Sequence, residues 1–191
     1  MQFQARIGLD IAISNRISIM PLGYAYIWNP IYGEQPAAFQ NNEHRFFQQI
    51  QYKHNWGRLK FLQRLRPEER FLEQRTNSNG SVIYDGYVNN QFRIRYRILC
   101  NIPLSEKGLV PGTWFVQAFD EVFISWGKSV STVQPDQNRL FTGMGYQFSS
   151  SFSIQAGIMY QLFIKPNGVQ QENNFGSSVY LVYNLDLSNQ D

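Results

Sequence analysis

Cysteine and histidine are almost absent from this 191-residue chain. Cys100 is the only cysteine, and His44 and His54 are the only histidines. A single cysteine cannot form an internal disulfide, and these side chains are too few for a cysteine metal cluster or a histidine metal site. We therefore expect neither a metal centre nor a cofactor.

Long apolar runs and strong charge are missing too. No stretch reaches the ~18 apolar residues that a membrane-spanning helix requires. Lys and Arg number 17 against 14 Asp and Glu, and this balance of +3 is too small to indicate a nucleic-acid partner. The sequence also has no low-complexity linker, so we expect one domain over residues 1–191.

Residues that favour β-structure are abundant. Aromatic residues make up 16% of the chain and hydrophobic residues 43%. The stretch NQFRIRYRILCNIPL, residues 90–104, alternates with a period of two and is therefore predicted to be a strand. One face carries Phe92, Ile94, Tyr96, Ile98, Cys100 and Ile102, and the other carries Gln91, Arg93, Arg95, Arg97 and Asn101, with Leu99 as the exception. Such a strand needs an apolar medium on one side and a polar compartment on the other.

This pattern is typical of a membrane β-barrel with its arginines in the lumen. Similar alternation predicts nine strands, over residues 3–13, 17–28, 43–54, 58–71, 90–104, 113–126, 139–148, 152–164 and 179–187. Short connections near residues 14, 56, 108 and 150 alternate with long loops over residues 29–42, 74–89, 127–138 and 165–174. Short periplasmic turns and long outer loops follow that order in outer-membrane barrels. We predict an all-β fold, an antiparallel up-and-down transmembrane β-barrel in the bacterial outer membrane.

Two positions interrupt the alternation. Pro21 predicts a bulge or a break in pairing, because proline cannot donate to a strand ladder. Asp120 falls on the lipid face of the strand over residues 113–126, where a carboxylate is costly. We expect a bulge near Phe119 that turns both Asp120 and Glu121 inward.

Strand parity and the missing export signal both concern the start of the chain. Nine strands with an outer N-terminus do not make a complete bacterial barrel, whose strand number is normally even. We therefore expect an odd number of strands upstream of Met1, giving ten or twelve in total. Export also requires a signal peptide, which residues 1–10 do not resemble, so we expect a mature or truncated form.

A soluble barrel of lipocalin type, with the faces reversed, is the alternative fold. Nine strands would then turn about five large apolar residues each inward, more than a small barrel holds. The predicted strands are also longer than the ~5–6 residues usual in soluble proteins. Trp28, Trp56, Trp114 and Trp126 lie at strand ends or turns, as in the aromatic belts of membrane proteins.

The polar faces predict a charged lumen that could work in two ways. Its walls would be lined by Arg45, Lys60, Arg64, Arg66, Glu68, Arg70, Arg93, Arg95, Arg97, Glu121 and Arg139. An open lumen of this kind is a narrow channel that prefers small anionic solutes. A lumen whose carboxylates, including Glu43, pair with the arginines is instead plugged, and the protein then has a structural or interaction role.

A lipid-acting enzyme of the outer membrane is a further alternative. Such enzymes need a serine within hydrogen-bond reach of a histidine, but the residue two positions after His44 is Phe46. We therefore expect no catalytic residues. The expected partners are outer-membrane lipid and other outer-membrane proteins, with no nucleic acid.

Several segments resemble a family of Gram-negative outer-membrane barrel proteins that is known only as a domain of unknown function. The similar segments are NEHRFFQQ at Asn42, GRLKFLQRLRPEERF at Gly57, FRIRYRI at Phe92, GTWFVQAFDEVFI at Gly112 and DQNRLFTGMGYQF at Asp136. They span most of the chain in the family's order. The resemblance implies the barrel, its location and at least one hairpin before the position of Met1, but no activity and no catalytic residues.

Overall fold

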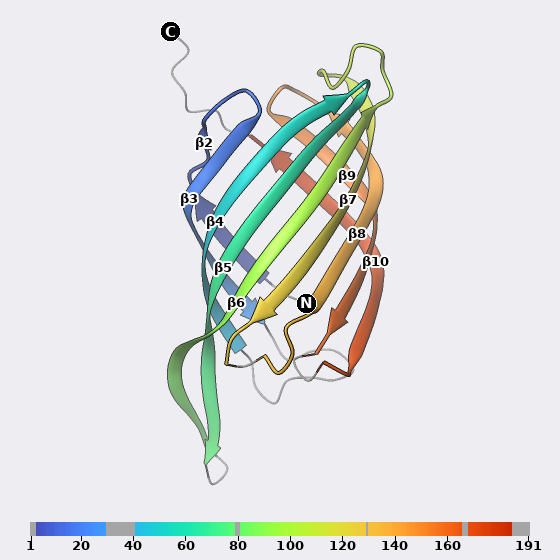
Figure 1. Ribbon diagram of the computed structural model, residues 1–191. Coiled ribbons are helices and arrows are strands. Elements are labelled where there is room, and N and C mark those ends of the chain that lie inside the picture. Colours follow the sequence, from blue (N-terminus) through green and yellow to red (C-terminus); the bar gives the residue numbers. More distant parts are fainter. Residues whose placement is uncertain (1–2, 30–40, 79–80, 129, 166–167, 185–191) are drawn as a thin grey trace.

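One antiparallel β-sheet makes up the fold, and it curls into an open barrel (Figure 1). The computed structural model describes residues 3–29, 41–78, 81–128, 130–165 and 168–184. Nine strands follow one another around the sheet, and a short tenth, β2 (Ile11–Ala12), pairs with β3. The nine are β1 (Phe3–Gly8), β3 (Ile17–Asn29), β4 (Asn41–Trp56), β5 (Leu59–Ser78), β6 (Ser81–Pro103), β7 (Thr113–Trp126), β8 (Pro135–Gln147), β9 (Phe152–Ile164) and β10 (Gln171–Tyr183). The predicted all-β, up-and-down topology is confirmed.

Within the part of the chain that the structure describes, no helix is long and apolar enough to span a bilayer.

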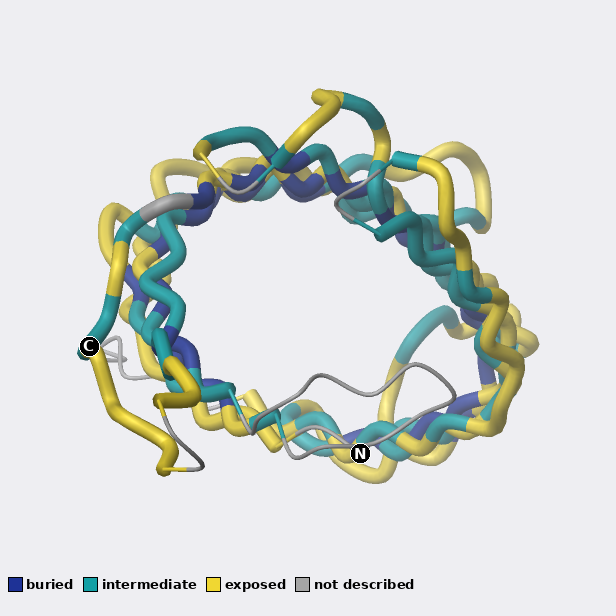
Figure 2. The backbone as a smooth tube through the Cα atoms, turned by 90° about the horizontal axis from the view of Figure 1, so that it is seen from below, coloured by how far each residue is buried: buried dark blue, intermediate teal, exposed yellow. Residues whose placement is uncertain are grey.

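The backbone forms a ring when it is viewed along the barrel axis (Figure 2). Its edge strands are β1 and β10, and no backbone pairing joins them within the described residues. Both occupy odd positions in an antiparallel series, so they run in the same direction. A strand placed between them would be antiparallel to each. The expectation of upstream strands stays a prediction.

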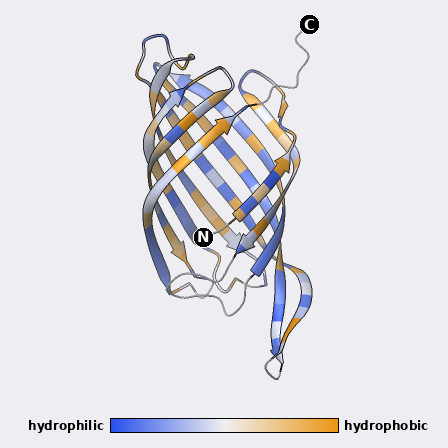
Figure 3. Ribbon diagram, turned by 180° about the vertical axis from the view of Figure 1, so that it is seen from behind, coloured by the Kyte–Doolittle hydropathy of each residue, from blue (hydrophilic) through white to orange (hydrophobic). Residues whose placement is uncertain are grey.

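Alternation places opposite chemistries on the two faces of the wall, as the banded strands in Figure 3 show. In β7 every second residue from Thr113 to Ser125 is buried, and the intervening ones face outward. The inner face carries buried arginines such as Arg66 and Arg95, whereas Ile94 and Ile98 are exposed on the outside. The lipocalin-type alternative requires a continuous apolar filling. It is wrong for the described interior, because the register turns arginine and glutamate inward.

The two ends of the barrel differ in their connections. At one end, which we call the turn end, lie the connections 13–16, 57–58, 104–112 and 148–151. At the other, β5 and β6 continue past the rim as a two-stranded hairpin that we call the arm (Figure 1); this is the arm end. The connections alternate between the two ends as predicted, but the predicted alternation of short and long does not hold. The connection 104–112 is longer than 127–134 or 165–170, so length alone does not distinguish the ends.

The loop predicted over residues 74–89 is wrong. Residues 74–78 and 81–89 belong to the arm, where β5 runs to Ser78 and β6 starts at Ser81. Val82, Ile83 and Tyr84 favour strands, and Gly86, with a φ of 88°, absorbs the register shift beside Gln74. The loop predicted over residues 29–42 lies mostly outside the described residues, as do residues 185–187 of the last predicted strand.

The two predicted irregularities had different outcomes. The register between β3 and β4 shifts between Met20 and Gly23, which confirms the bulge at Pro21. The bulge near Phe119 is wrong, because β7 pairs without interruption there on both sides. Asp120 therefore stays on the outer face, where Asn138 Nδ2 donates to its carboxylate at 2.6 Å. That hydrogen bond reduces the cost of an outward carboxylate, which the sequence pattern alone did not reveal.

Candidate functional site in the barrel interior

The inner faces of β5 and β6 form a ladder along the barrel axis. From the arm end to the turn end, the facing pairs are Arg70 and Gln91, Glu68 and Arg93, Arg66 and Arg95, Arg64 and Arg97, Leu62 and Leu99, and Lys60 and Asn101. The first four levels all contain arginine, whereas the fifth has leucine on both strands. The charged faces of these two strands are therefore neighbours on the inner wall.

Three glutamates and four arginines form one continuous chain of ion pairs, which we call the ion-pair chain. Each glutamate lies between two arginines, and its side chain is at most 4% exposed. The links are Arg70–Glu43 (2.6 Å), Glu43–Arg45 (2.8 Å), Arg45–Glu68 (3.2 Å), Glu68–Arg95 (2.7 Å), Arg95–Glu121 (3.0 Å) and Glu121–Arg64 (2.5 Å). Because buried charges are costly unless they are paired, each carboxylate supports two guanidinium groups at once. The chain ties β4, β5, β6 and β7 together.

Among the other inward arginines, Arg66, Arg97 and Arg139 form no ion pair within the described residues. Each lies over a phenylalanine ring instead, with centroid distances of 4.4 Å for Arg66 and Phe47, 5.7 Å for Arg97 and Phe119, and 5.1 Å for Arg139 and Phe123. A cation–π contact is worth about 0.5–2 kcal/mol and leaves the positive charge in place. The interior therefore has more positive charge than its carboxylates neutralise.

An apolar cluster lies on the turn-end side of the ion-pair chain. Leu99, Phe119 and Phe141 are buried in it, and Phe141 is fully enclosed. Leu62, Met159 and Tyr180 pack around them. Nearer the turn end, Phe115 lies over Gly145, where a Cβ would overlap its ring. Leu99, the exception in the sequence pattern, thus belongs to a packed apolar layer that follows the inner wall from β5 to β10.

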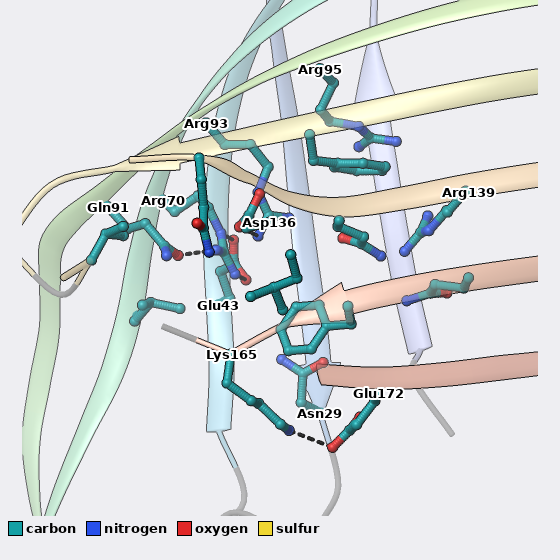
Figure 4. Close-up of a pocket in the computed structure, with 18 of the residues that line it drawn as sticks. Asn29, Glu43, Arg70, Gln91, Arg93, Arg95, Asp136, Arg139, Lys165 and Glu172 are labelled. Atoms are coloured by element: carbon teal, nitrogen blue, oxygen red, sulfur yellow. Dashed lines mark hydrogen bonds and ion pairs between the residues drawn. The ribbon is translucent and has the colours of Figure 1, made fainter. Parts of the chain in front are cut away.

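A cavity of about 570 Å³ occupies the arm end of the interior, and we call it the vestibule (Figure 4). Its charged lining consists of the basic residues Arg45, Arg70, Arg93, Arg95, Arg139 and Lys165 and the acidic residues Glu43, Asp136 and Glu172. Phe123 contributes a ring to the same wall, and no residue of the apolar cluster reaches the cavity. The vestibule is therefore a charged chamber that ends at the ion-pair chain.

Arg93 and Arg139 are held in the vestibule without a close carboxylate. The Nε of Arg93 donates to Ser125 Oγ at 3.0 Å, and its Nη2 lies 3.7 Å from Asp136 Oδ2. When the side-chain amide of Gln137 turns its oxygen toward Arg139, the Arg139 guanidinium donates to that oxygen at 3.0 Å. The close partners of both groups are neutral, and Asp136 is only a distant partner of Arg93, so much of their charge is available to a ligand.

The predicted lumen residues separate along the axis. Glu68 and Glu121 join Arg45, Arg64, Arg70 and Arg95 in the ion-pair chain, whereas Arg66, Arg97 and Arg139 lie over rings. Arg93 enters the vestibule, and Lys60 faces Asn101 near the turn end, away from the vestibule. Sequence reasoning missed Asp136, Lys165 and the inward rings of Phe47 and Phe123. The sequence did contain a sign of Phe123, because it lies two residues after Glu121 and therefore on the same face of β7.

The match to known families comes from a model described as "Protein of unknown function (DUF2490)", which covers residues 1–173. The chain belongs to this family. No curated protein and no solved structure matches the chain. The DUF2490 match includes every residue of the ion-pair chain and all of β1 to β9.

The outer face of this DUF2490 chain is aromatic near both rims. Near the arm end, Phe92 stacks on Trp126 with centroids 6.0 Å apart, and Phe3 stacks on Trp28 at 5.1 Å. Near the turn end, Trp114 contacts Tyr146 at 4.9 Å. The steps from Trp114 to Trp126, at about 3.3 Å each and a tilt of about 40°, cover roughly 30 Å along the axis.

Outward polar groups of the DUF2490 chain are engaged locally. His44 Nδ1 and the Tyr24 hydroxyl share a hydrogen bond of 2.7 Å, and the ring of Tyr87 lies against His44 at 4.3 Å. The Tyr96 hydroxyl donates to Gln63 Oε1 at 2.7 Å. The described residues contain no group of three His, Cys, Asp or Glu side chains that could hold a metal ion.

Proposed function

We propose that this protein is an integral outer-membrane β-barrel with a structural or interaction role and an interior closed to conduction. The observation that carries the proposal is the inversion of polarity across the wall, with exposed aliphatic side chains outside and buried arginines inside. Apolar surface of that extent is unfavourable in water and favourable against lipid tails.

The dimensions of the apolar belt support a membrane location. An outward apolar band of about 25 Å between two aromatic girdles is the usual outer surface of an outer-membrane barrel. The outward residues of β7 fit this pattern, with Trp114 and Trp126 at the ends and Val116, Val122 and Ile124 between them. In this orientation the arm end faces the exterior, because most turn-end connections, 13–16, 57–58 and 148–151, are short, and the short turns of such barrels face the periplasm.

The layers inside the barrel favour a closed lumen. An ion must pass the vestibule, then the ion-pair chain, and then the cluster around Phe119 and Phe141. Fully paired charges offer few free donors to a permeating anion, and the apolar layer offers none. Closure in the middle leaves the rims, the arm and the vestibule as the surfaces on which partners act.

Membrane insertion is tested by carbonate extraction and heat-modifiable migration of the exported protein. We expect it to stay in the membrane pellet and to migrate faster when it is not boiled. Ile98→Arg, in the middle of the outer belt, should reduce insertion by the ~2–4 kcal/mol of a cation at the bilayer midplane. Val110→Arg, in the connection at the turn end, is the matched control. Release of the unmodified protein into the carbonate supernatant contradicts the proposal.

A narrow anion-preferring channel is the second candidate, and the surplus of inward arginine favours it. Planar-bilayer recording separates the two. We expect no steady conductance from the native protein, and an anion-selective one from Phe119→Ala combined with Phe141→Ala, because those changes open the apolar layer. A steady anion-selective conductance of the native protein supports the channel instead.

The proposed role is not enzymatic. His44 is engaged by Tyr24 and surrounded by aromatic rings, which suits a rim residue better than a general base. Purified protein incubated with phospholipid should release no fatty acid above the level of a boiled sample. Release that disappears in His44→Ala contradicts this part of the proposal.

A further inference from the structure

The vestibule has the charge and size of a ligand site rather than of a passage. Six basic and three acidic side chains line it, and its volume of about 570 Å³ lies within the 300–1,000 Å³ of small-molecule sites. The ion-pair chain forms its inner end, so a ligand that enters from the arm end has no route onward. A closed chamber with excess positive charge binds anions and retains them.

The geometry of the arginines narrows the ligand class. Guanidinium groups bind phosphate through paired donors, and preorganised groups lose little entropy on binding. Phe123 fixes three of them, with Arg95, Arg139 and Arg93 at 4.6, 5.1 and 5.5 Å from its ring centroid. These cations converge from β6 and β8 on one part of the wall (Figure 4).

The charge balance sets the number of phosphates. A carboxylate ligand brings about one negative charge, whereas a phosphate ester brings about 1.5 to 2. Two phosphate groups therefore offset the surplus of three basic side chains in the lining. We propose that the vestibule binds a solute or headgroup that carries two phosphate groups, held mainly by Arg93, Arg139 and Lys165.

Lys165 is the contact at the rim of this site, where a ligand enters from the arm end. Its Nζ pairs with Glu172 at 2.6 Å, and both side chains remain partly exposed at the rim. An incoming phosphate can share Lys165 without breaking a buried pair. Arg93 and Arg139 lie deeper and outside the ion-pair chain, so replacing them leaves the chain intact.

Calorimetry on the full-length protein in zwitterionic detergent tests the site. The soluble probe is inorganic pyrophosphate, and the lipid probe is diacylglycerol pyrophosphate in mixed micelles. We expect at least one to bind with an affinity that falls as salt rises. Binding of pyrophosphate alone identifies a free solute as the natural class, and binding of the lipid alone identifies a headgroup.

Variants in which a basic residue is replaced by glutamine test whether the probe binds in the vestibule. Arg93→Gln combined with Arg139→Gln should weaken binding on the order of a hundredfold, and Lys165→Gln on the order of tenfold. Arg16→Gln, in an exposed turn at the opposite end, should change it by less than about twofold. No binding of either probe, or equal losses in the double variant and Arg16→Gln, overturns the proposal.

The inference rests on the proposed membrane function only for the direction in which the vestibule opens. A protein that leaves the membrane on carbonate extraction yet binds pyrophosphate contradicts the membrane proposal alone. A protein that stays in the membrane and binds neither probe contradicts the vestibule site alone. If the double variant no longer shows the heat-modifiable migration of a folded barrel, the binding affinity of Lys165→Gln, at the rim, tests the site in its place.

Discussion

The two halves of the interior solve the problem of filling a barrel in different ways. Toward the arm end, charged side chains line the interior, and the ion-pair chain from Arg70 to Arg64 satisfies many of them. Toward the turn end, Leu99, Phe119 and Phe141 fill it by packing. Charged filling depends on every partner being present, whereas apolar filling depends on volume. Substitutions in the two halves should therefore differ in the size, the salt dependence and the sign of their effect on the free energy of unfolding.

The largest effect should come from the centre of the charged half. Glu68→Gln removes the carboxylate that supports both Arg45 and Arg95, and leaves two buried guanidinium groups short of a partner. We expect a loss of about 3–5 kcal/mol in the free energy of unfolding, measured by urea titration in detergent micelles.

Glu106→Gln, in the exposed turn-end connection, is the control for that change and should cost less than about 0.5 kcal/mol. Equal stability of the two variants would show that the ion-pair chain does not hold the strands together.

The apolar half should lose nearly as much from one ring. Phe141 is fully enclosed, and Phe141→Ala should cost about 3–4 kcal/mol through lost burial and the cavity left behind. Unlike the Glu68 variant, this loss should not change between low and high salt. Phe148→Ala, at an exposed ring one residue past the end of the same strand, should cost about 1 kcal/mol or less. A marked salt dependence of the Phe141 variant contradicts the division of the interior.

The boundary between the halves should respond with the opposite sign. Arg97 faces the apolar cluster, and its buried Nε has no hydrogen-bond partner among the described residues. Arg97→Met keeps the length of the side chain and removes the unpaired charge, so we expect a gain of about 1 kcal/mol. Arg95→Met, two residues away but inside the ion-pair chain, should instead lose about 3 kcal/mol. Losses of similar size in both variants would place Arg97 within the charged half.

The smallest effect should come from a neutral contact of the vestibule. Ser125→Ala removes the hydroxyl that accepts from Arg93 Nε. We expect a loss of about 1 kcal/mol in stability and a several-fold weaker binding of the phosphate probe, since Arg93 is then less well oriented. Thr132→Ala, elsewhere in the vestibule lining, is the comparison. Unchanged probe affinity in Ser125→Ala contradicts the orienting role.

The period of two in the sequence was enough to predict the strands and their faces. It predicted β7 and β9 with their observed bounds, and it identified Leu99 as the residue that departs from the arginine face. It failed where local pattern and pairing disagree. Residues 74–89 contain turn-forming residues, yet β5 and β6 pair through them to form the arm. Asp120 stays outward because neighbouring strands keep β7 in register, and Asn138 lies close enough to donate to it.

By itself, the sequence determined which side chains share a face, because successive residues of a strand point to opposite sides of the sheet. It therefore also determined that arginines face one compartment and aliphatic residues the other. Only the tertiary structure decided which glutamate pairs with which arginine, where the charged filling gives way to the apolar cluster, and that a vestibule remains at the arm end. Those features depend on the register and tilt of strands far apart in the chain. The pairing of β6 with both β5 and β7, for example, brings Glu121 to Arg64.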